Sequence, residues 1–359
     1  MIQPDRDVTF DSGGVPTHAS YRGPVAGTTG TPAAIIIGGT GDIDRNGTAP
    51  TNPPLKTETY SWLADLLSAQ GIASIRYDKL GTGATGLGPY AADPAAMLPL
   101  GYDQLRVQPA RDALAFLAAQ PGVDRQRLLV IGHSEGGVVS VALLQRPGNA
   151  PAATGLALVE PSYTAYFDIL SRQVTDQLNA AVAAGVVTAA DADTLRAWMK
   201  DGFAQIRQGS PPFPAPGPAP LPAATGATAA LQAAIQTNTY GSDPTGMVLA
   251  HSDRTAYSKD FDAITPAVIA ATIRIPTFVS CGTKDFNTPC GDGTRGSGVV
   301  ALAEAFPPGV AQLVTIPNMV HVLRDVGVAT VPEVADQISS PLSTTFADGF
   351  TAFLRGWKR

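Results

Sequence analysis

The chain has 359 residues, of which 44% are hydrophobic and 15% are charged. This composition supplies a sizeable apolar core and excludes a wholly disordered chain. The net charge of −6 argues against a nucleic-acid-binding protein, because such proteins normally carry a basic stripe. At this length we expect one large domain with an insertion, or two domains.

No apolar run approaches the length needed to cross a bilayer, so we expect no transmembrane helix. Residues 1–7 (MIQPDRD) lack the apolar core of a secretory signal. The protein is therefore expected in the cytoplasm or, after removal of a signal, in a secreted or periplasmic location.

The first 160 residues alternate between predicted strands and helices. Gly13 and Gly14 separate two weakly alternating runs, so residues 1–30 are expected to contain a β-hairpin. Short apolar runs predict buried strands at 33–37, 72–77, 128–131 and 156–159. Helical spacing of apolar residues predicts helices at 57–70, 105–119 and 135–144. This order is typical of an α/β fold with a mostly parallel sheet and helices on both faces.

The alternation breaks at Pro161 and resumes with strands at 277–280 and 311–316 and a helix at 340–357. The intervening residues are Ala-rich and helical in pattern, except at 210–222, which proline and glycine dominate. We therefore expect an α/β core from residues 1–160 and 273–359. Residues 161–272 are expected to form a mainly helical cap over the carboxyl ends of the strands.

A Gly-x-Ser-x-Gly segment centred on Ser134 lies between a predicted strand and a predicted helix. On such a sharp turn the serine backbone is strained and its hydroxyl is exposed, and side chains at Gly132 and Gly136 would collide with neighbouring elements. We therefore predict Ser134 as a nucleophile. The alternative is a tight turn with an incidental serine.

Three segments carry a family resemblance: residues 39–47 (GTGDIDRNG), 76–83 (RYDKLGTG) and 132–137 (GHSEGG). They resemble the α/β-hydrolase superfamily and, more narrowly, its bacterial serine esterases and peptidase-like hydrolases. Thr40 stands where that group has serine, and Leu80 where it has arginine; neither change removes a reacting group. The resemblance implies an α/β-hydrolase fold and a serine hydrolase activity.

The chain has four histidines, so the general base can be sought by elimination. His321 follows the last predicted strand and fits the order nucleophile, acid, histidine that this fold uses. His18 lies in the predicted hairpin and His133 next to the nucleophile, and His251 is the second choice. We predict His321 as the base; the alternative is a histidine on a surface loop.

The acid is expected on a loop after a strand. Asp285 lies just past the strand at 277–280 and matches the Gly-x-x-Asp segment of the resembled family. Glu160, at the end of the preceding strand, is the alternative acid, because some members of the wider fold place it there. Otherwise Glu160 is a charge at the mouth of the site or a strand-end cap.

Backbone N–H groups should form an oxyanion hole for the developing negative charge. One is expected from Glu135, which follows the nucleophile, and the other from Thr40, in the loop after the first buried strand. Glycines on both sides of Thr40 would allow close approach. The alternative is that this loop is only a turn at a strand end.

Cys281 and Cys290 are the only cysteines and flank Asp285. A disulfide between them would contribute about 2–3 kcal/mol in the chain-entropy model. It would also imply an oxidising compartment, which favours a secreted or periplasmic location. The alternative is two independent thiols in a cytosolic protein.

No metal or cofactor is expected. Asp42, Asp44 and Asn46 copy the first half of a calcium loop, but its twelfth position is Pro53, where glutamate is required. We expect this loop instead to be ordered, with Asp44 and Arg45 bracing the oxyanion turn.

These patterns predict a serine hydrolase that cleaves small-molecule carboxylic esters through an acyl-enzyme. The weakly charged insertion suits a substrate with an apolar acyl or alcohol part. Amidase, peptidase and thioesterase activities on the same triad are alternatives. The alternative without enzymatic activity is a binding protein on a lapsed hydrolase fold. The sequence does not indicate an oligomeric state.

Overall fold

The computed structural model describes residues 2–210, 256–291, 297–331 and 334–359. The chain divides into two compact units, one of residues 1–89, 106–164 and 265–359 and one of residues 90–105 and 165–264. The second unit contains most of the predicted insertion, and in addition residues 90–105. Apart from Ser210, the proline-rich segment at 210–222 lies outside the described residues.

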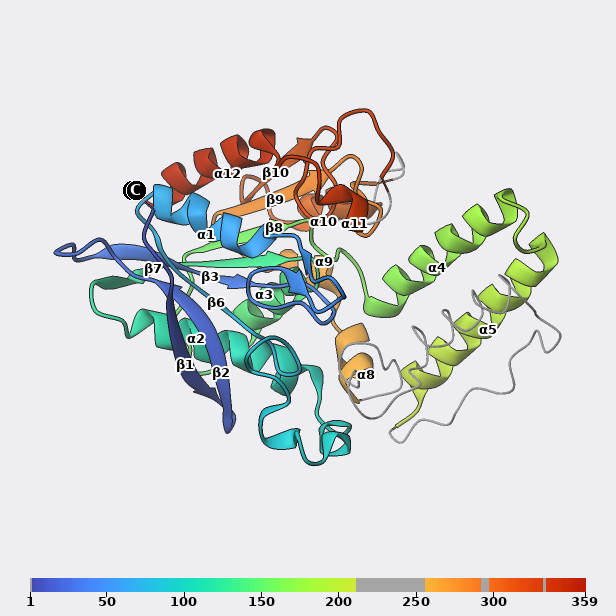
Figure 1. Cartoon of the computed structure of the whole chain (residues 1–359), viewed down its shortest axis with the longest axis horizontal. Helices are drawn as coiled ribbons and strands as arrows, with labels where there is room; N and C mark the ends of the chain where they lie inside the picture. The colour runs from blue at the N-terminus through green and yellow to red at the C-terminus, as the bar shows by residue number, and fades with distance from the viewer. Residues whose placement is uncertain (1, 211–255, 292–296, 332–333) are drawn as a thin grey trace. The chain divides into compact units, whose positions relative to one another are not determined.

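The first unit is built on an eight-stranded sheet with the order β1-β2-β6-β3-β7-β8-β9-β10 (Figure 1). Its strands are β1 (Arg6–Ser12), β2 (Val15–Arg22), β3 (Thr31–Ile37), β6 (Ala73–Tyr77), β7 (Val123–His133), β8 (Gly155–Val159), β9 (Thr277–Gly282) and β10 (Ala311–Ile316). Strand β2 pairs antiparallel with β1 and β6, and all other pairs are parallel. The mostly parallel sheet confirms the predicted fold class.

The antiparallel edge begins with a tight hairpin between β1 and β2. Gly13 and Gly14 both have positive φ, 59° and 84°, which a two-residue turn matched to the strand twist requires. A separate two-stranded sheet, β4 (Thr48–Ala49) with β5 (Leu55–Lys56), was not predicted because its strands are only two residues long.

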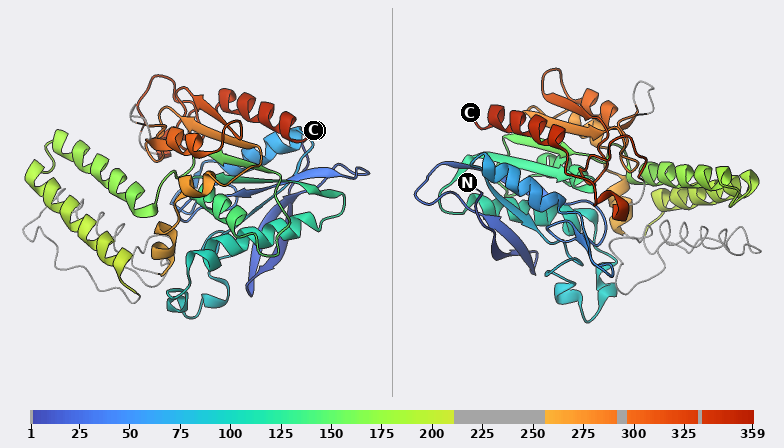
Figure 2. Two further views of the ribbon diagram at one scale, coloured as in Figure 1. Left: turned by 180° about the vertical axis from the view of Figure 1, so that it is seen from behind. Right: turned by 45° about the horizontal axis from the view of Figure 1, so that its top comes forward.

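Helices cover both faces of the large sheet. Figures 1 and 2 show α1 (Thr59–Ala69) and α12 (Thr344–Trp357) over one face, and α2 (Gln108–Ala118) and α3 (Glu135–Gln145) over the other. These four helices match the helices predicted from apolar spacing to within a few residues. Short helices α10 (Gly298–Ala305) and α11 (Val334–Gln337) were not predicted, because one or two turns give too little periodicity. Helix α9 (Pro266–Ala270) lies within the stretch that was expected to be mainly helical.

The core under α1 and α12 is aromatic and aliphatic. Phe346, Phe350 and Phe353 are spaced to share one side of α12, and their rings meet Phe278 of β9. The Ser343 hydroxyl caps this helix by accepting a hydrogen bond from the Phe346 N–H. The cap and the aromatic stripe together explain why this segment is helical and why it docks on β9.

Three short helical turns lie in or at the ends of residues 90–105: η1 (Gly88–Tyr90), η2 (Pro94–Met97) and the π-helical η3 (Asp103–Val107). The second unit contains α4 (Tyr166–Ala183), α5 (Ala189–Gln208) and α8 (Ala256–Asp262). An apolar cluster that includes Phe167, Leu195 and Phe203 joins α4 to α5. None of the helices in the described part of the chain is long and apolar enough to cross a membrane.

The aromatic cluster gives a stability prediction. Phe350→Ala should lower the free energy of unfolding by about 3–5 kcal/mol, because it opens a cavity in a core where Phe350 is fully buried. Urea denaturation measures this loss. Val328→Ala, at a residue that is 97% exposed, is the control and should change the free energy by less than about 0.5 kcal/mol. Equal effects of the two substitutions would contradict the assigned core.

Candidate active site

Ser134 lies on a sharp turn between β7 and α3, with φ 55° and ψ −121°. A Cβ atom at Gly132 would collide with the carbonyl oxygen of Gly136, and a Cβ at Gly136 would collide with that of Ile37. Helix α3 begins at Glu135, so its first N–H groups and positive dipole end lie beside the serine. This turn presents a serine side chain at the carboxyl ends of the parallel strands.

His321 and Asp285 form a hydrogen-bonded pair on two neighbouring loops. His321 follows β10 and Asp285 follows β9, and 2.7 Å separates Nδ1 of the imidazole from Oδ2 of the carboxyl. Asp285 also accepts hydrogen bonds from the backbone N–H of Asn287 and from the N–H and hydroxyl of Thr288. Burial acts to raise the pKa of Asp285, but the His321 charge and these hydrogen bonds outweigh it and hold the pKa below its usual value. His251 lies outside the described residues.

His133 connects the serine turn to the loop that carries His321. Burial lowers the pKa of His133 to about 3, so its imidazole is neutral. Its Nε2 lies 2.9 Å from the backbone carbonyl oxygen of His321, and its Nδ1 lies 3.2 Å from the hydroxyl of Tyr60. The neutral ring satisfies both contacts when Nε2 carries the proton and Nδ1 accepts one from the Tyr60 hydroxyl. His133 therefore fixes the position of His321.

The loop after β3 lies directly against Ser134. A Cβ atom at Gly39 would lie 2.9 Å from the Ser134 Cβ and 3.4 Å from its hydroxyl oxygen. The Gly39 N–H donates a 2.7 Å hydrogen bond to the Tyr60 hydroxyl. Thr40 is the residue after Gly39 in this loop, and Glu135 is the residue after Ser134, so each predicted donor is the chain neighbour of one member of this close contact.

The remainder of this loop is braced as the sequence suggested. The Asp44 carboxylate accepts hydrogen bonds from the N–H groups of Asn46 and Thr48. Arg45 donates to the buried Asp78 through both its backbone N–H and its guanidinium, each at 2.7 Å. These contacts hold residues 44–48, which follow Thr40 in the same loop.

Two cations near the serine turn were not recognised from sequence. The Lys79 ammonium donates to the carbonyl oxygens of Gly39 and Gly41. The Arg106 guanidinium lies 3.3 Å from the carboxylate of Glu135, and both side chains are buried. Lys79 belongs to the segment that resembles the family, but Arg106 lies in a predicted helix, where no local signal separates it from a surface residue.

Glu160 is fully buried beside Asp285 but does not bind the imidazole in this structure. Its carboxyl accepts hydrogen bonds from the Ser280 hydroxyl and the Gly282 N–H at 2.8 and 2.6 Å. Burial and then the Asp285 charge raise the pKa of Glu160 well above its ordinary value. The structure thus places the two candidate acids side by side and pairs only Asp285 with His321.

Cys281 and Cys290 form a disulfide, as the sequence suggested. Cys281 is buried within β9, and Cys290 closes the loop that contains Asp285. The bond therefore ties the loop that holds the acid to the sheet.

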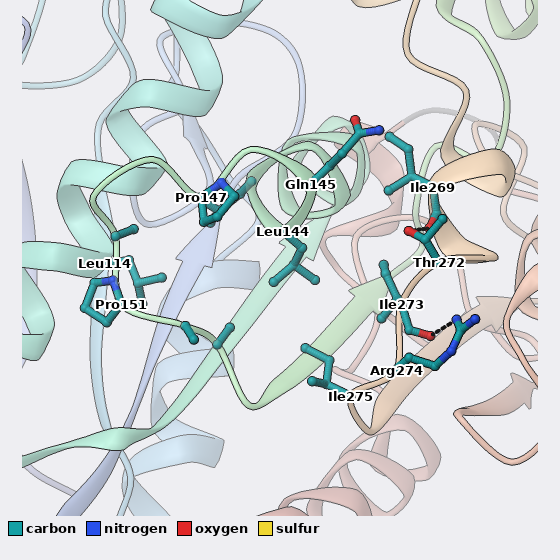
Figure 3. Close-up of a pocket in the computed structure, with 14 residues that line it drawn as sticks. Leu114, Leu144, Gln145, Pro147, Pro151, Ile269, Thr272, Ile273, Arg274 and Ile275 are labelled. Atoms are coloured by element: carbon teal, nitrogen blue, oxygen red, sulfur yellow. Dashed lines mark hydrogen bonds between the residues drawn. The ribbon is translucent and has the colours of Figure 1, made fainter.

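Within the described residues, no group of three or more His, Cys, Asp or Glu side chains could hold a metal ion. A largely apolar pocket of about 270 Å³ lies at the C-terminal end of α3 (Figure 3). Leu144, Ile269 and Ile273 are among its lining residues. Ser134 is at the opposite end of α3, about 15 Å away along the helix, so this pocket is separate from the serine turn.

No protein-family model and no curated protein matches this sequence. Among solved structures, the chain is similar to a 2,6-dihydroxy-pseudo-oxynicotine hydrolase, with TM-score 0.51 and 15% identity, covering 94% of this chain and 68% of that one. It is similar to proline iminopeptidase from Mycobacterium smegmatis, with TM-score 0.53 and 15% identity over 98% and 99% of the two chains. It is also similar to acylaminoacyl peptidase from Pyrococcus horikoshii, with TM-score 0.54 and 10% identity over 99% and 42%. The chain therefore has the α/β-hydrolase fold.

The raised pKa of Glu160 gives a prediction about stability and pH. A carboxyl that binds its proton more tightly in the folded state contributes stability that is lost as the pH rises from its ordinary pKa of 4.5 toward the raised value. The free energy of unfolding of the wild type should therefore fall more between pH 5 and pH 8 than that of Glu160→Gln, which cannot ionise. Urea denaturation at both pH values measures the difference.

Glu160→Ala is the control for the hydrogen bonds of this side chain, because it removes the acceptor atoms as well as the charge. It leaves the Ser280 hydroxyl and the Gly282 N–H without their acceptor, at a cost of about 1–3 kcal/mol for each buried donor. Identical pH dependence in the wild type and in Glu160→Gln would show that Glu160 is ionised in the folded protein.

Proposed function

We propose that this protein is a serine hydrolase that cleaves carboxylic esters through an acyl-enzyme on Ser134. The observation that carries the proposal is the 2.7 Å pair of His321 and Asp285, on loops that follow β10 and β9, while the strained serine turn follows β7 in the parallel part of the same sheet. The α/β-hydrolase fold supports it, because this fold places a nucleophile, an acid and a histidine in that chain order.

In the proposed reaction, the Ser134 hydroxyl attacks the ester carbonyl while Nε2 of His321 accepts its proton. Asp285 holds the Nδ1–H side of the imidazole and stabilises the charged form. The protonated His321 then gives its proton to the leaving alcohol. Water, activated by the same histidine, hydrolyses the acyl-enzyme and regenerates the serine.

The backbone N–H groups of Thr40 and Glu135 would stabilise the oxyanion. The close approach of Gly39 to Ser134 supports this assignment, because it brings the Gly39–Thr40 peptide next to the reacting hydroxyl. Glu135 is the first residue of α3, where the positive end of the helix dipole favours a negative charge. Such donors stabilise charge that develops only in the transition state.

Esters are favoured over amides and peptides as substrates, because the sequence shows no clear acidic or basic residue that would bind a peptide terminus. The second unit is proposed to act as the cap, and its apolar, weakly charged composition suits a small substrate with an apolar acyl or alcohol part. The disulfide supports a secreted or periplasmic location. Amides and thioesters, and a binding protein without activity, are the competing outcomes of the test below.

The nucleophile is tested with p-nitrophenyl esters from acetate to long acyl chains. Ser134→Ala should lower kcat/KM by at least about 10⁴-fold, because the acyl-enzyme of the proposed mechanism forms on its hydroxyl. Ser339→Ala, at an exposed serine, is the control and should retain wild-type activity. Activity that survives in Ser134→Ala would overturn the mechanism, and inactivity of the wild type on every ester would favour the competing outcomes.

The acid is tested with the same esters. Asp285→Asn should lower kcat by about 10⁴-fold, because an amide cannot hold the imidazole in the required tautomer. A loss of this size in Glu160→Gln, with activity retained in Asp285→Asn, would assign the acid to Glu160 instead.

The disulfide is tested by the double substitution Cys281→Ser with Cys290→Ser. Loss of the cross-link should lower the free energy of unfolding by about 2–3 kcal/mol, because the unfolded chain regains the entropy of the closed loop. Thermal or urea denaturation measures this change. An oxidised wild type no more stable than the double variant would contradict a stabilising role.

A further inference from the structure

Lys79 is a buried cation that the proposed mechanism does not use. It follows β6 and is 5% exposed, and its ammonium donates to the carbonyl oxygens of Gly39 and Gly41. These two carbonyls lie on either side of Thr40. A buried lysine is unusual because desolvation of its charge is costly. Its position against the proposed oxyanion loop therefore calls for a functional explanation.

The Lys79 ammonium binds the carbonyl of the Gly39–Thr40 peptide, and the N–H of the same peptide is the proposed oxyanion donor. The Gly39 carbonyl and the Thr40 N–H belong to the same planar peptide, in which the two groups point in opposite directions. A cation bound to the carbonyl oxygen therefore orients the Thr40 N–H away from Lys79. It also withdraws electrons from the peptide and makes its N–H a stronger donor, as in a cooperative hydrogen-bond chain.

Other contacts already fix the position of this loop. The Gly39 N–H is bound to the Tyr60 hydroxyl, Asp44 binds the backbone at Asn46 and Thr48, and Arg45 is bound to Asp78. Removal of the Lys79 charge should therefore leave the loop near its place while weakening the donor. This separates an electrostatic role from a purely structural one.

The surroundings of Lys79 allow its charge to change at moderately alkaline pH. Burial lowers its pKa to about 8, opposed by the negative charges of Glu135 and Asp42 and assisted by the positive charge of Arg106. The charge of Lys79 also acts on His133, which is neutral. Asp44, Arg45, Tyr60, Arg76 and Tyr77 line a small cavity together with Lys79.

We propose that Lys79 is a positioning residue that orients and polarises the Gly39–Thr40 peptide, and thereby strengthens the Thr40 N–H as an oxyanion donor. The proposal rests on the serine hydrolase function proposed above. Lys79 would therefore stabilise the transition state, where the oxyanion exists, and contribute little to the binding of the ester itself.

Lys79→Met tests the role of the charge. We expect kcat for p-nitrophenyl butyrate to fall about 10–100-fold, with KM changed less than about two-fold, because the lost stabilisation exists only in the transition state. Lys358→Met is the matched control, since its ammonium also binds a backbone carbonyl, that of Gln70, and it should retain wild-type kcat. Lys79→Gln keeps a neutral donor and serves if Lys79→Met does not fold.

The pH profile separates the proposed role from a structural one. The kcat of the wild type should fall as the pH rises through about 8, where the ammonium loses its proton. This alkaline fall should be absent in Lys79→Met and Lys79→Gln. A lysine with a lowered folded pKa makes the fold more stable as the pH rises from about 8 to 10.5, so the fall in kcat would not reflect a loss of stability at this group.

The outcomes distinguish this proposal from the proposed function. If the wild type is active but Lys79→Met keeps the alkaline fall, or retains full kcat, the proposal for Lys79 is wrong and the hydrolase function stands. If the wild type hydrolyses no ester, the hydrolase function is wrong as stated. The amide chemical shifts of Thr40 then test the contact itself: a change with pH centred near 8 that is absent in Lys79→Met supports it, and a change that Lys79→Met keeps, or no change in the wild type, overturns it.

Discussion

The strained, positive-φ backbone of Ser134 is the constraint on which the rest of the site depends. A non-glycine residue in such a conformation costs about 1–3 kcal/mol unless its surroundings hold it. Here the Ser134 N–H binds the carbonyl of Val159, and its own carbonyl accepts from the N–H groups of Gly137 and Ser162. Hydrogen bonds to β8 and α3 thus hold Ser134 in its strained conformation. Gly132 leaves room for the close approach of the Gly136 backbone, because it has no side chain.

A neutral imidazole connects three loops that are distant in sequence. Hydrogen bonds run from Gly39 to Tyr60, from Tyr60 to His133, and from His133 to the backbone of His321. The side chain of His321 continues the connection to Asp285. Burial, which keeps His133 uncharged, lets one ring donate at one nitrogen and accept at the other, so the relative positions of the loops depend on its protonation state.

The fold and the serine turn could be predicted because both depend on local patterns. Apolar runs, helical spacing and the glycines around Ser134 are visible within short windows of sequence. The contacts of Tyr60, Lys79 and Arg106 could not be predicted in the same way. Lys79 binds a carbonyl 40 residues away, and Tyr60 contacts a histidine 73 residues away. In sequence, such residues resemble an ordinary core aromatic or surface charge, and only the sheet order brings them to the serine.

The adjacency of Glu160 and Asp285 has a consequence for the charge balance of the site. Two ionised carboxylates side by side in a buried space would repel each other, and the raised pKa of Glu160 relieves this by favouring its uncharged form. In the uncharged form of Glu160, the buried pair carries one negative charge rather than two. With Glu160 uncharged, a His321 that is protonated during the proposed reaction faces the single negative charge of Asp285. The His321–Asp285 pair is then electrically neutral, and the oxyanion is the remaining negative charge, which the backbone N–H donors stabilise.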